Sequence, residues 1–186
     1  MRELSLNIMD VTQNSVTAKA DLIKISIVEN DDEKSMEIKI EDNGCGMSEE
    51  TVRKVIDPFY TTRTTRDVGL GIPLFKMQAE MTGGSFEISS KVGIGTKISA
   101  VFITSHIDMM PLGDINSTIL PLITGNENID FLYTRVFIKN RKEKSFALDT
   151  REVKDELGED VSLSLPDVVL WLMEYLKENT EEIIDL

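Results

Sequence analysis

The sequence has little of several residue types that define whole classes of protein. Its 186 residues include one cysteine, one tryptophan and one histidine. A single cysteine, Cys45, cannot form an internal disulfide, so a disulfide-stapled scaffold is excluded. No apolar run approaches the ~18 residues that a membrane-spanning helix needs, and the first residues lack the pattern of a signal peptide. We therefore expect a cytoplasmic protein.

Basic side chains are also scarce. Lysine and arginine number 20 against 33 aspartates and glutamates, which gives a formal net charge of −13. The imbalance is concentrated in residues 149–186, which hold 3 basic and 12 acidic side chains. Such a surface repels polyanions, so we expect neither nucleic acid nor an anionic membrane as a partner. The remaining composition, 41% apolar and 28% charged, is that of an ordinary globular protein.

Hydrophobic spacing predicts the secondary structure of the first part of the chain. In chain order we expect a helix over residues 1–20, strands around 22–27 and 36–40, a helix capped by Ser48, a loop over 60–68, a helix over 71–82, and strands around 86–88 and 97–102.

The pattern changes after residue 106, and we place a domain boundary there. The predicted domains are residues 1–106 and a small acidic α+β module over 107–186. The module is expected to contain a helix over 115–123, a hairpin of strands at 131–137 and 145–148, and a last helix that begins with a capping box over 164–167.

Two segments contain carboxylates in suggestive places. Asp42 follows an alternating strand and is flanked by Gly44 and Gly46, so it can lie where the backbone approaches a ligand closely. The same residues also suit a plain strand-to-helix turn. Asp10 and Asn14 share a helix face. The amide oxygen of Asn14 would suit magnesium, although an exposed helix face with an ordinary hydrogen bond also explains the spacing.

Two further segments are rich in glycine. Gly69-Leu70-Gly71 stands at a predicted helix start, where backbone N–H groups and the helix dipole favour a phosphate. Arg63 and Arg66 lie close enough in sequence to close over that phosphate. The segment from Gly93 to Thr96 fits a hairpin turn. The P-loop pattern Gly-x-x-x-x-Gly-Lys-Ser/Thr does not occur.

In order and spacing, these four segments resemble the four boxes of the Bergerat-fold ATP-binding superfamily. That superfamily includes gyrase, large heat-shock chaperones, sensor histidine kinases and mismatch-repair ATPases. The resemblance covers residues 1–104, and the segment from Asp57 to Arg63 resembles the sensor-kinase branch. It implies a two-layer α/β sandwich, in which helices cover one face of a mixed sheet and ATP lies between helix and sheet.

The resemblance also implies a role for each residue. Asp42 would accept a hydrogen bond from the adenine amino group, with Thr96 assisting through a water. The base pocket would be shaped by Gly44, Gly46 and Met47. Asn14 would bind Mg²⁺ that bridges the phosphates of ATP. The phosphates would be held by Arg63, Arg66, and the amides of Gly69, Leu70 and Gly71.

Asp10 occupies the catalytic position of the resemblance, where hydrolysing members carry glutamate and many kinases carry asparagine. A carboxylate there could deprotonate an attacking water. Asp67 replaces the usual first glycine of the second glycine box. Because nine residues precede Asp10, we do not expect the phospho-accepting helical pair of sensor kinases, and His106 is expected to be structural.

These observations favour an ATP-binding protein of the histidine-kinase-like type. The expected function is that of a stand-alone kinase or ATP-driven switch that acts on a separate protein partner. Two alternatives stay open from the sequence. One is a binding module in which nucleotide occupancy changes affinity for a partner without catalysis. The other is a serine kinase of the anti-sigma type, which would share the ATP domain.

Overall fold

In the computed structural model of the protein, residues 3–57, 70–158 and 161–186 are described. Up to residue 106 the elements are α1 (Leu4–Thr17), β1 (Leu22–Asn30), β2 (Ser35–Asp42), α2 (Glu49–Val55), α3 (Gly71–Met81), β3 (Ser85–Lys91) and β4 (Gly95–Ile103). Each of them was predicted. The hydroxyl of Ser48 accepts a hydrogen bond from the amide of Thr51, so the predicted cap of α2 is confirmed. The predicted loop over 60–68 lies outside the described residues.

The later elements are α4 (Asn116–Thr124), β5 (Asp130–Lys139), β6 (Lys142–Asp149), α5 (Thr150–Leu157) and α6 (Pro166–Ile184). The sequence did not predict α5, which follows β6 directly and is capped by the Asp149 carboxylate. The predicted capping box is wrong. The residue before Pro166 is Leu165, which offers no side-chain cap, and the Ser164 amide donates to Glu127 instead.

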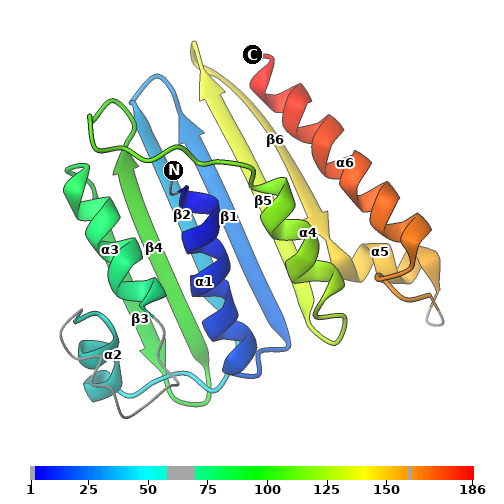
Figure 1. Cartoon of the computed structure of the whole chain (residues 1–186), viewed down its shortest axis with the longest axis horizontal. Coiled ribbons are helices and arrows are strands. Elements are labelled where there is room, and N and C mark those ends of the chain that lie inside the picture. Colours follow the sequence, from blue (N-terminus) through cyan, green and yellow to red (C-terminus); the bar gives the residue numbers. More distant parts are fainter. Residues whose placement is uncertain (1–2, 58–69, 159–160) are drawn as a thin grey trace.

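The six strands form one sheet in the order β3-β4-β2-β1-β5-β6 (Figure 1). β1 and β5 run parallel, whereas the other neighbouring pairs are antiparallel. Helices α1, α3, α4 and α6 lie over one face of this sheet. The predicted mixed sheet with helices on one face is therefore confirmed.

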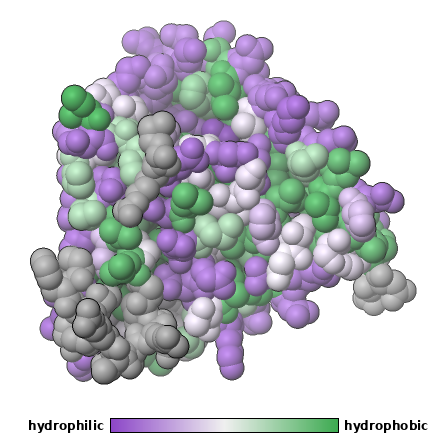
Figure 2. Space-filling model, in the orientation of Figure 1, coloured by the Kyte–Doolittle hydropathy of each residue, from purple (hydrophilic) through white to green (hydrophobic). Residues whose placement is uncertain are grey.

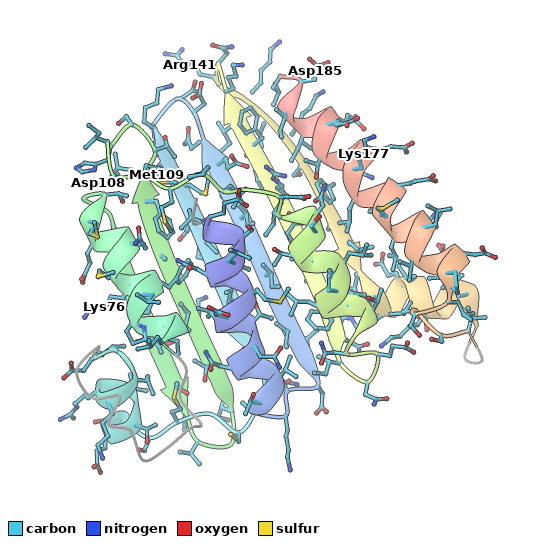
Figure 3. All side chains as sticks on the ribbon, viewed as in Figure 1. Lys76, Asp108, Met109, Arg141, Lys177 and Asp185 are labelled. Carbon is cyan, nitrogen blue, oxygen red and sulfur yellow. The ribbon has the colours of Figure 1, made fainter. Side chains whose placement is uncertain are left out.

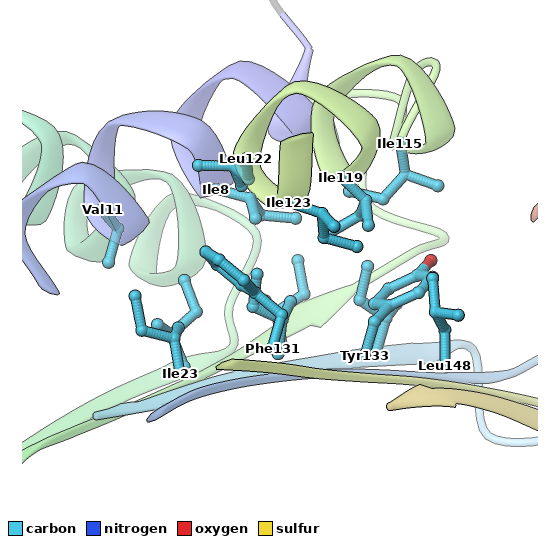
Figure 4. Packing of buried hydrophobic residues seen from close by; sticks show 14 of the residues in the cluster. Ile8, Val11, Ile23, Ile115, Ile119, Leu122, Ile123, Phe131, Tyr133 and Leu148 are labelled. Carbon is cyan, nitrogen blue, oxygen red and sulfur yellow. The ribbon is translucent and has the colours of Figure 1, made fainter. Parts of the chain in front are cut away.

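The core lies between the sheet and the helices because alternate strand residues point to one side. Ile23, Phe131 and Tyr133 point from the sheet toward the apolar faces of α1 and α4 (Figure 4). Burial of an apolar side chain as large as Ile23 or Phe131 contributes about 1.5–3 kcal/mol. The opposite face carries polar residues that pair across strands, such as Lys97 with Glu41 at 2.7 Å. This polarity explains why helices cover one face only.

Residues beyond 106 continue the same sheet. β5 pairs with β1 along its whole length, and the buried Arg135 of β5 forms an ion pair with Glu29 of β1. The turn between β5 and β6 is fastened to the β1–β2 loop, because the Asp32 carboxylate accepts hydrogen bonds from the amides of Asn140 and Arg141. Figure 3 shows Arg141 at the tip of that turn. The division into two domains at residue 107 stays a prediction, although one sheet passes through both parts.

The surface on the helix side is mostly hydrophilic, with apolar side chains gathered over α6 (Figure 2). There Leu170, Trp171 and Met173 are each more than two-fifths exposed. Within the described parts of the chain, no helix combines the length and apolar character needed to cross a bilayer.

Candidate nucleotide-binding site

A cavity of about 260 Å³ opens where the C-terminal half of α1 meets β2 and β4. Its walls are mainly apolar, with a few polar groups, which is the usual composition of a small-molecule site. The lining residues come from α1 (Val11, Asn14, Ser15, Thr17, Ala18), from β2 and the following loop (Asp42, Cys45, Gly46, Met47), from α2 and α3 (Thr51, Val55, Ile72), and from β4 (Thr96, Ile98). The cavity thus brings together predicted residues from three of the four sequence segments.

The Asp42 carboxylate is the best-fixed polar group in this cavity. Its Oδ2 accepts a hydrogen bond of 2.7 Å from the Ser15 hydroxyl, and its Oδ1 accepts one of 2.9 Å from the Gly44 amide. An ionised carboxylate has about four acceptor positions, so these two bonds hold its orientation and leave acceptor capacity for a ligand. A hydrogen-bonded carboxylate of this kind can recognise an amino group.

The loop after Asp42 passes very close to neighbouring backbone. At Gly46 the backbone has φ +64°, and an added Cβ would lie 2.0 Å from the carbonyl oxygen of Lys91. Only glycine fits there. The Cys45 amide donates to the carbonyl of Ala18, at the end of α1, which draws the loop against the helix. Close approach of this backbone to a ligand stays a prediction.

Thr96 begins the opposite wall on β4, directly across from Asp42 in the β2–β4 pairing. Its hydroxyl lies 2.9 Å from the hydroxyl of Ser90 on β3. Ser90 also accepts a hydrogen bond from the amide of Met47, at 2.8 Å. One serine therefore connects the β2–α2 loop, the edge strand and Thr96.

Asp10 and Asn14 lie on the side of α1 that meets the start of α3. The Asn14 amide nitrogen donates to the Asp10 carbonyl at 3.3 Å, and in the described chain its amide oxygen has no hydrogen-bond donor. At Gly71 an added Cβ would lie 3.0 Å from the Cβ of Asp10, so glycine lets α3 begin against this residue. Asp10 and the first turn of α3 thus meet beside Asn14, which lines the cavity together with Ile72 of α3.

A magnesium ion would find few protein ligands at this place. Among the described residues, no group of three His, Cys, Asp or Glu side chains could hold a metal ion. One free amide oxygen, on Asn14, fits a magnesium ion that takes its other ligands from phosphates and water. The residues present are therefore compatible with Mg²⁺ bound together with a phosphate ligand.

The structure places some of the remaining predicted residues beside Asp42 and one of them away from it. Gly44, Gly46, Met47 and Thr96 surround Asp42, whereas Leu70 is exposed immediately before α3. Arg63, Arg66 and Gly69 lie outside the described residues, so their predicted roles stay predictions.

Sequence reasoning missed Ser15 and Ser90, which orient the polar groups of the cavity. Ser15 is adjacent to Asn14, and this adjacency was a usable signal. Ser90 could not be found in that way, because only the β3–β4 pairing brings it to Thr96.

Comparison with known proteins identifies the same part of the chain. The family model described as "Histidine kinase-, DNA gyrase B-, and HSP90-like ATPase" matches residues 1–106. The autoinducer 2 sensor kinase/phosphatase LuxQ of Vibrio cholerae is 26% identical over 166 residues, which make up 82% of this chain and 19% of LuxQ. Sensor protein SrrB of Staphylococcus aureus is 35% identical over 101 residues, or 52% of this chain and 17% of SrrB. This chain spans less than a fifth of the length of these two relatives.

A solved structure supports the fold. The N-terminal domain of a DNA repair protein superposes with a TM-score of 0.52 at 14% identity, covering 80% of this chain and 53% of that one. At this identity the likeness concerns the fold alone. Because the match covers 80% of this chain, it extends beyond the residues that the family model matches.

Proposed function

The chain belongs to the family of histidine kinase-, DNA gyrase B- and HSP90-like ATPases, and from that premise we propose that it binds Mg²⁺-ATP in the cavity beside Asp42 and transfers the terminal phosphoryl group to a separate protein. The observation that supports this best is the Asp42 carboxylate, which Ser15 and Gly44 hold at the wall of the cavity. The named relatives LuxQ and SrrB are sensor proteins, which favours a role in signalling.

In this proposal the base and the phosphates occupy opposite ends of the cavity. Asp42 accepts a hydrogen bond from the adenine amino group, between the apolar side chains of Met47 and Ile98. The phosphates extend toward Asn14 and the first turn of α3, where the helix dipole favours negative charge. Bound through Asn14, Mg²⁺ would neutralise phosphate charge.

Transfer breaks the bond between the terminal phosphorus and its bridging oxygen, so ADP leaves as the acceptor bonds to phosphorus. Asp10 is exposed beside Asn14 and can take the proton that the acceptor loses, either from the ring N–H of an imidazole or from a hydroxyl. The single histidine of the chain, His106, lies in a turn after β4, where its Nδ1 accepts a hydrogen bond from the Asp108 amide. The proposal places the acceptor, a histidine, on a separate partner protein.

A second candidate function is a nucleotide-dependent binding module without catalysis. The observation that favours it is the exposed apolar set on α6, Leu170, Trp171 and Met173, which does not touch the cavity. An anti-sigma-type serine kinase is the third candidate, since it would use the same cavity. A cytoplasmic location fits all three, because Cys45 is a free thiol and ATP is required.

Labelled ATP separates these candidates. We expect the protein, given γ-labelled ATP and Mg²⁺ in an extract of its own cells, to label a second protein with an acid-labile phosphate. An acid-stable label would indicate serine instead, and binding of ATP without any labelled protein would favour the binding module. Asn14→Ala should abolish the label and the magnesium dependence of ATP affinity while nucleoside binding remains. Equal magnesium dependence in both proteins would contradict the role of Asn14.

Alkylation of Cys45 gives an independent measure of occupancy. This exposed thiol lies in the cavity wall, so bound ATP should slow its reaction with a maleimide several-fold. An alkylation rate that saturating ATP leaves unchanged would place the nucleotide elsewhere.

A further inference from the structure

An aromatic pair lies on the outer surface of α6, where apolar side chains gather (Figure 2), and takes no part in the cavity. The single tryptophan of the chain, Trp171, is 44% exposed, and its ring lies against that of Tyr175 with the ring centroids 5.4 Å apart. Tyr175 is fixed in turn, because its hydroxyl donates to the Ala147 carbonyl of β6 and its ring meets Phe146 edge-on. The exposed indole is therefore held in place by the core beneath it.

An aromatic side chain that is both exposed and fixed is suited to binding. Freedom that Trp171 has already lost in the folded protein is not lost again when a partner binds, so the entropic cost of binding is reduced. Tryptophan is enriched among the residues that supply most of the energy of protein interfaces. The face of its ring also attracts a cation.

Carboxylates surround this aromatic pair. α6 has one basic side chain, Lys177, and five acidic ones: Asp167, Glu174, Glu178, Glu181 and Glu182. Glu174 and Glu178 follow Trp171 by three and seven positions, so they share its side of the helix. None of the five forms an ion pair with any residue that the structure describes, whereas Glu49 and Glu50 of α2 each pair with a basic residue one turn further on.

The charge of this surface decides what can cover it. A second copy of the chain would bring two sets of carboxylates together, and an anionic membrane or a nucleic acid would be repelled. An arginine-rich segment complements both features of the surface, because a guanidinium group pairs with carboxylates and also stacks on aromatic rings. Lysine does this less well, since its ammonium group is compact and strongly hydrated.

We propose that α6 presents a docking surface for an arginine-rich segment of a separate protein, formed by the aromatic pair together with Glu174 and Glu178. One guanidinium lies over the indole of Trp171, and neighbouring ones pair with the two carboxylates. The inference goes beyond the proposed nucleotide function, because none of these residues lines the cavity. It holds whether or not the protein transfers a phosphoryl group.

The test uses the full chain and a synthetic peptide in which arginine alternates with leucine. Because Trp171 is the only tryptophan, its fluorescence reports directly on this surface. We expect the peptide to shift the emission saturably to shorter wavelength, as the indole is withdrawn from water. Replacing every arginine by lysine should weaken binding about threefold, the scale of a cation–π contact at an exposed site. Replacing every arginine by glutamate should abolish binding.

Two variants locate the binding on α6. Glu178→Gln leaves the tryptophan in place and should weaken binding about threefold, the scale of one exposed ion pair. Glu87→Gln is the matched control, because it removes the same charge from an exposed position on β3, at the opposite edge of the sheet. Trp171→Ala, measured by calorimetry, should weaken binding about tenfold.

Equal weakening by Glu178→Gln and Glu87→Gln would show attraction to net charge alone and would overturn the inference. Failure of the arginine peptide to bind, or equal binding of the glutamate peptide, would overturn it as well. A dimer in sedimentation that Trp171→Ala dissociates would assign the surface to a second copy instead. These readouts involve no nucleotide, so failure of this inference and failure of the proposed function are distinguishable.

Discussion

The central strands of the sheet carry polar groups at both of their ends, and the two groups differ in how they use their hydrogen-bonding capacity. Around the cavity, Asp42 and Asn14 keep part of their hydrogen-bonding capacity unused within the described chain. In the C-terminal part, the buried Arg135 donates twice to Glu29, and Asp32 holds two amides of the β5–β6 turn. We call the region around the cavity, which we propose binds a ligand, the prepared end, and the region where Arg135 and Asp32 find their partners within the protein the satisfied end.

This difference suggests what the C-terminal part contributes to the site. The amides at the start of α1, on Leu4 and Ser5, donate to the carbonyls of Pro111 and Leu112. Thr118 of α4 donates to the carbonyl of Ser5. α1 carries Asp10, Asn14 and Ser15, so the internally paired region supports the helix on which the site is built.

The largest expected effect is a loss of folding stability when the ion pair between Arg135 and Glu29 is removed. Arg135→Ala leaves Glu29 without its buried partner, and removal of one member of a buried pair costs about 3–5 kcal/mol of unfolding free energy. Urea denaturation measures this loss. ATP affinity of the molecules that remain folded should be unchanged, because Arg135 does not line the cavity.

Arg53→Ala is the matched control for Arg135. Arg53 pairs with Glu49 on the exposed surface of α2, where an ion pair contributes roughly 0–1 kcal/mol. Equal losses of stability for the two variants would show that burial of the Arg135 pair carries no special cost, and the contrast between the two ends would fail.

A smaller effect concerns the prepared end. Ser15→Ala removes the donor to Asp42 Oδ2, so the carboxylate loses one of the two bonds that orient it. We expect ATP affinity to fall about tenfold, which corresponds to about 1.4 kcal/mol and lies near the range for a hydrogen bond to a charged group. Calorimetry measures the affinity, with the exposed Ser145→Ala as control. If Ser15→Ala leaves ATP affinity unchanged, the hydrogen bond from the Gly44 amide is enough to orient the Asp42 carboxylate.

The smallest effect is a difference in acid sensitivity. Three carboxyls in the C-terminal part have lowered pKa values: Asp114 through the Ser117 hydroxyl, Glu127 through Ser164 and Ser162, and Asp149 through Arg151. A lowered pKa in the folded state stabilises above the unfolded pKa, and this contribution is lost as pH falls through the folded value.

Asp114 lies at the start of α4 and Asp149 at the start of α5, while Glu127, which follows α4, accepts hydrogen bonds from the segment before α6. Hydrogen exchange should therefore show α4, α5 and α6 losing protection below about pH 4, near the ordinary pKa of these groups, before β2 and β4 do. Simultaneous loss throughout the sheet would erase this difference between the two regions.

Sequence predicted the fold well where periodicity was strong. The alternation in β2 and the helical spacing of Leu4, Ile8 and Val11 both gave the correct buried faces. It failed at α5, where an eight-residue polar helix continues directly from a strand with no break in the pattern. It also failed at Ser164, because Glu127, distant in sequence, takes the amide that a local cap would have used.

The candidate site could likewise be predicted only where the signal was local in the sequence. Asp42, Gly46 and Thr96 could be recognised because local spacing and resemblance act within short segments. Ser90 could not, since its partners come from a loop and a strand that only the folded sheet brings together. Contacts between residues on different strands and loops were thus the part of the site that the sequence could not predict.

The central claim is that the cavity beside Asp42 binds adenine nucleotides, and calorimetric titration of Mg²⁺-ATP into Asp42→Asn tests it most directly. Asparagine replaces an acceptor carboxylate by a mixed amide, so affinity should fall by about 1.5–3 kcal/mol, or at least tenfold. Asp155→Asn, at an exposed position in α5, should bind as the wild-type protein does. ATP affinity within twofold of wild type for a folded Asp42→Asn protein would contradict the account.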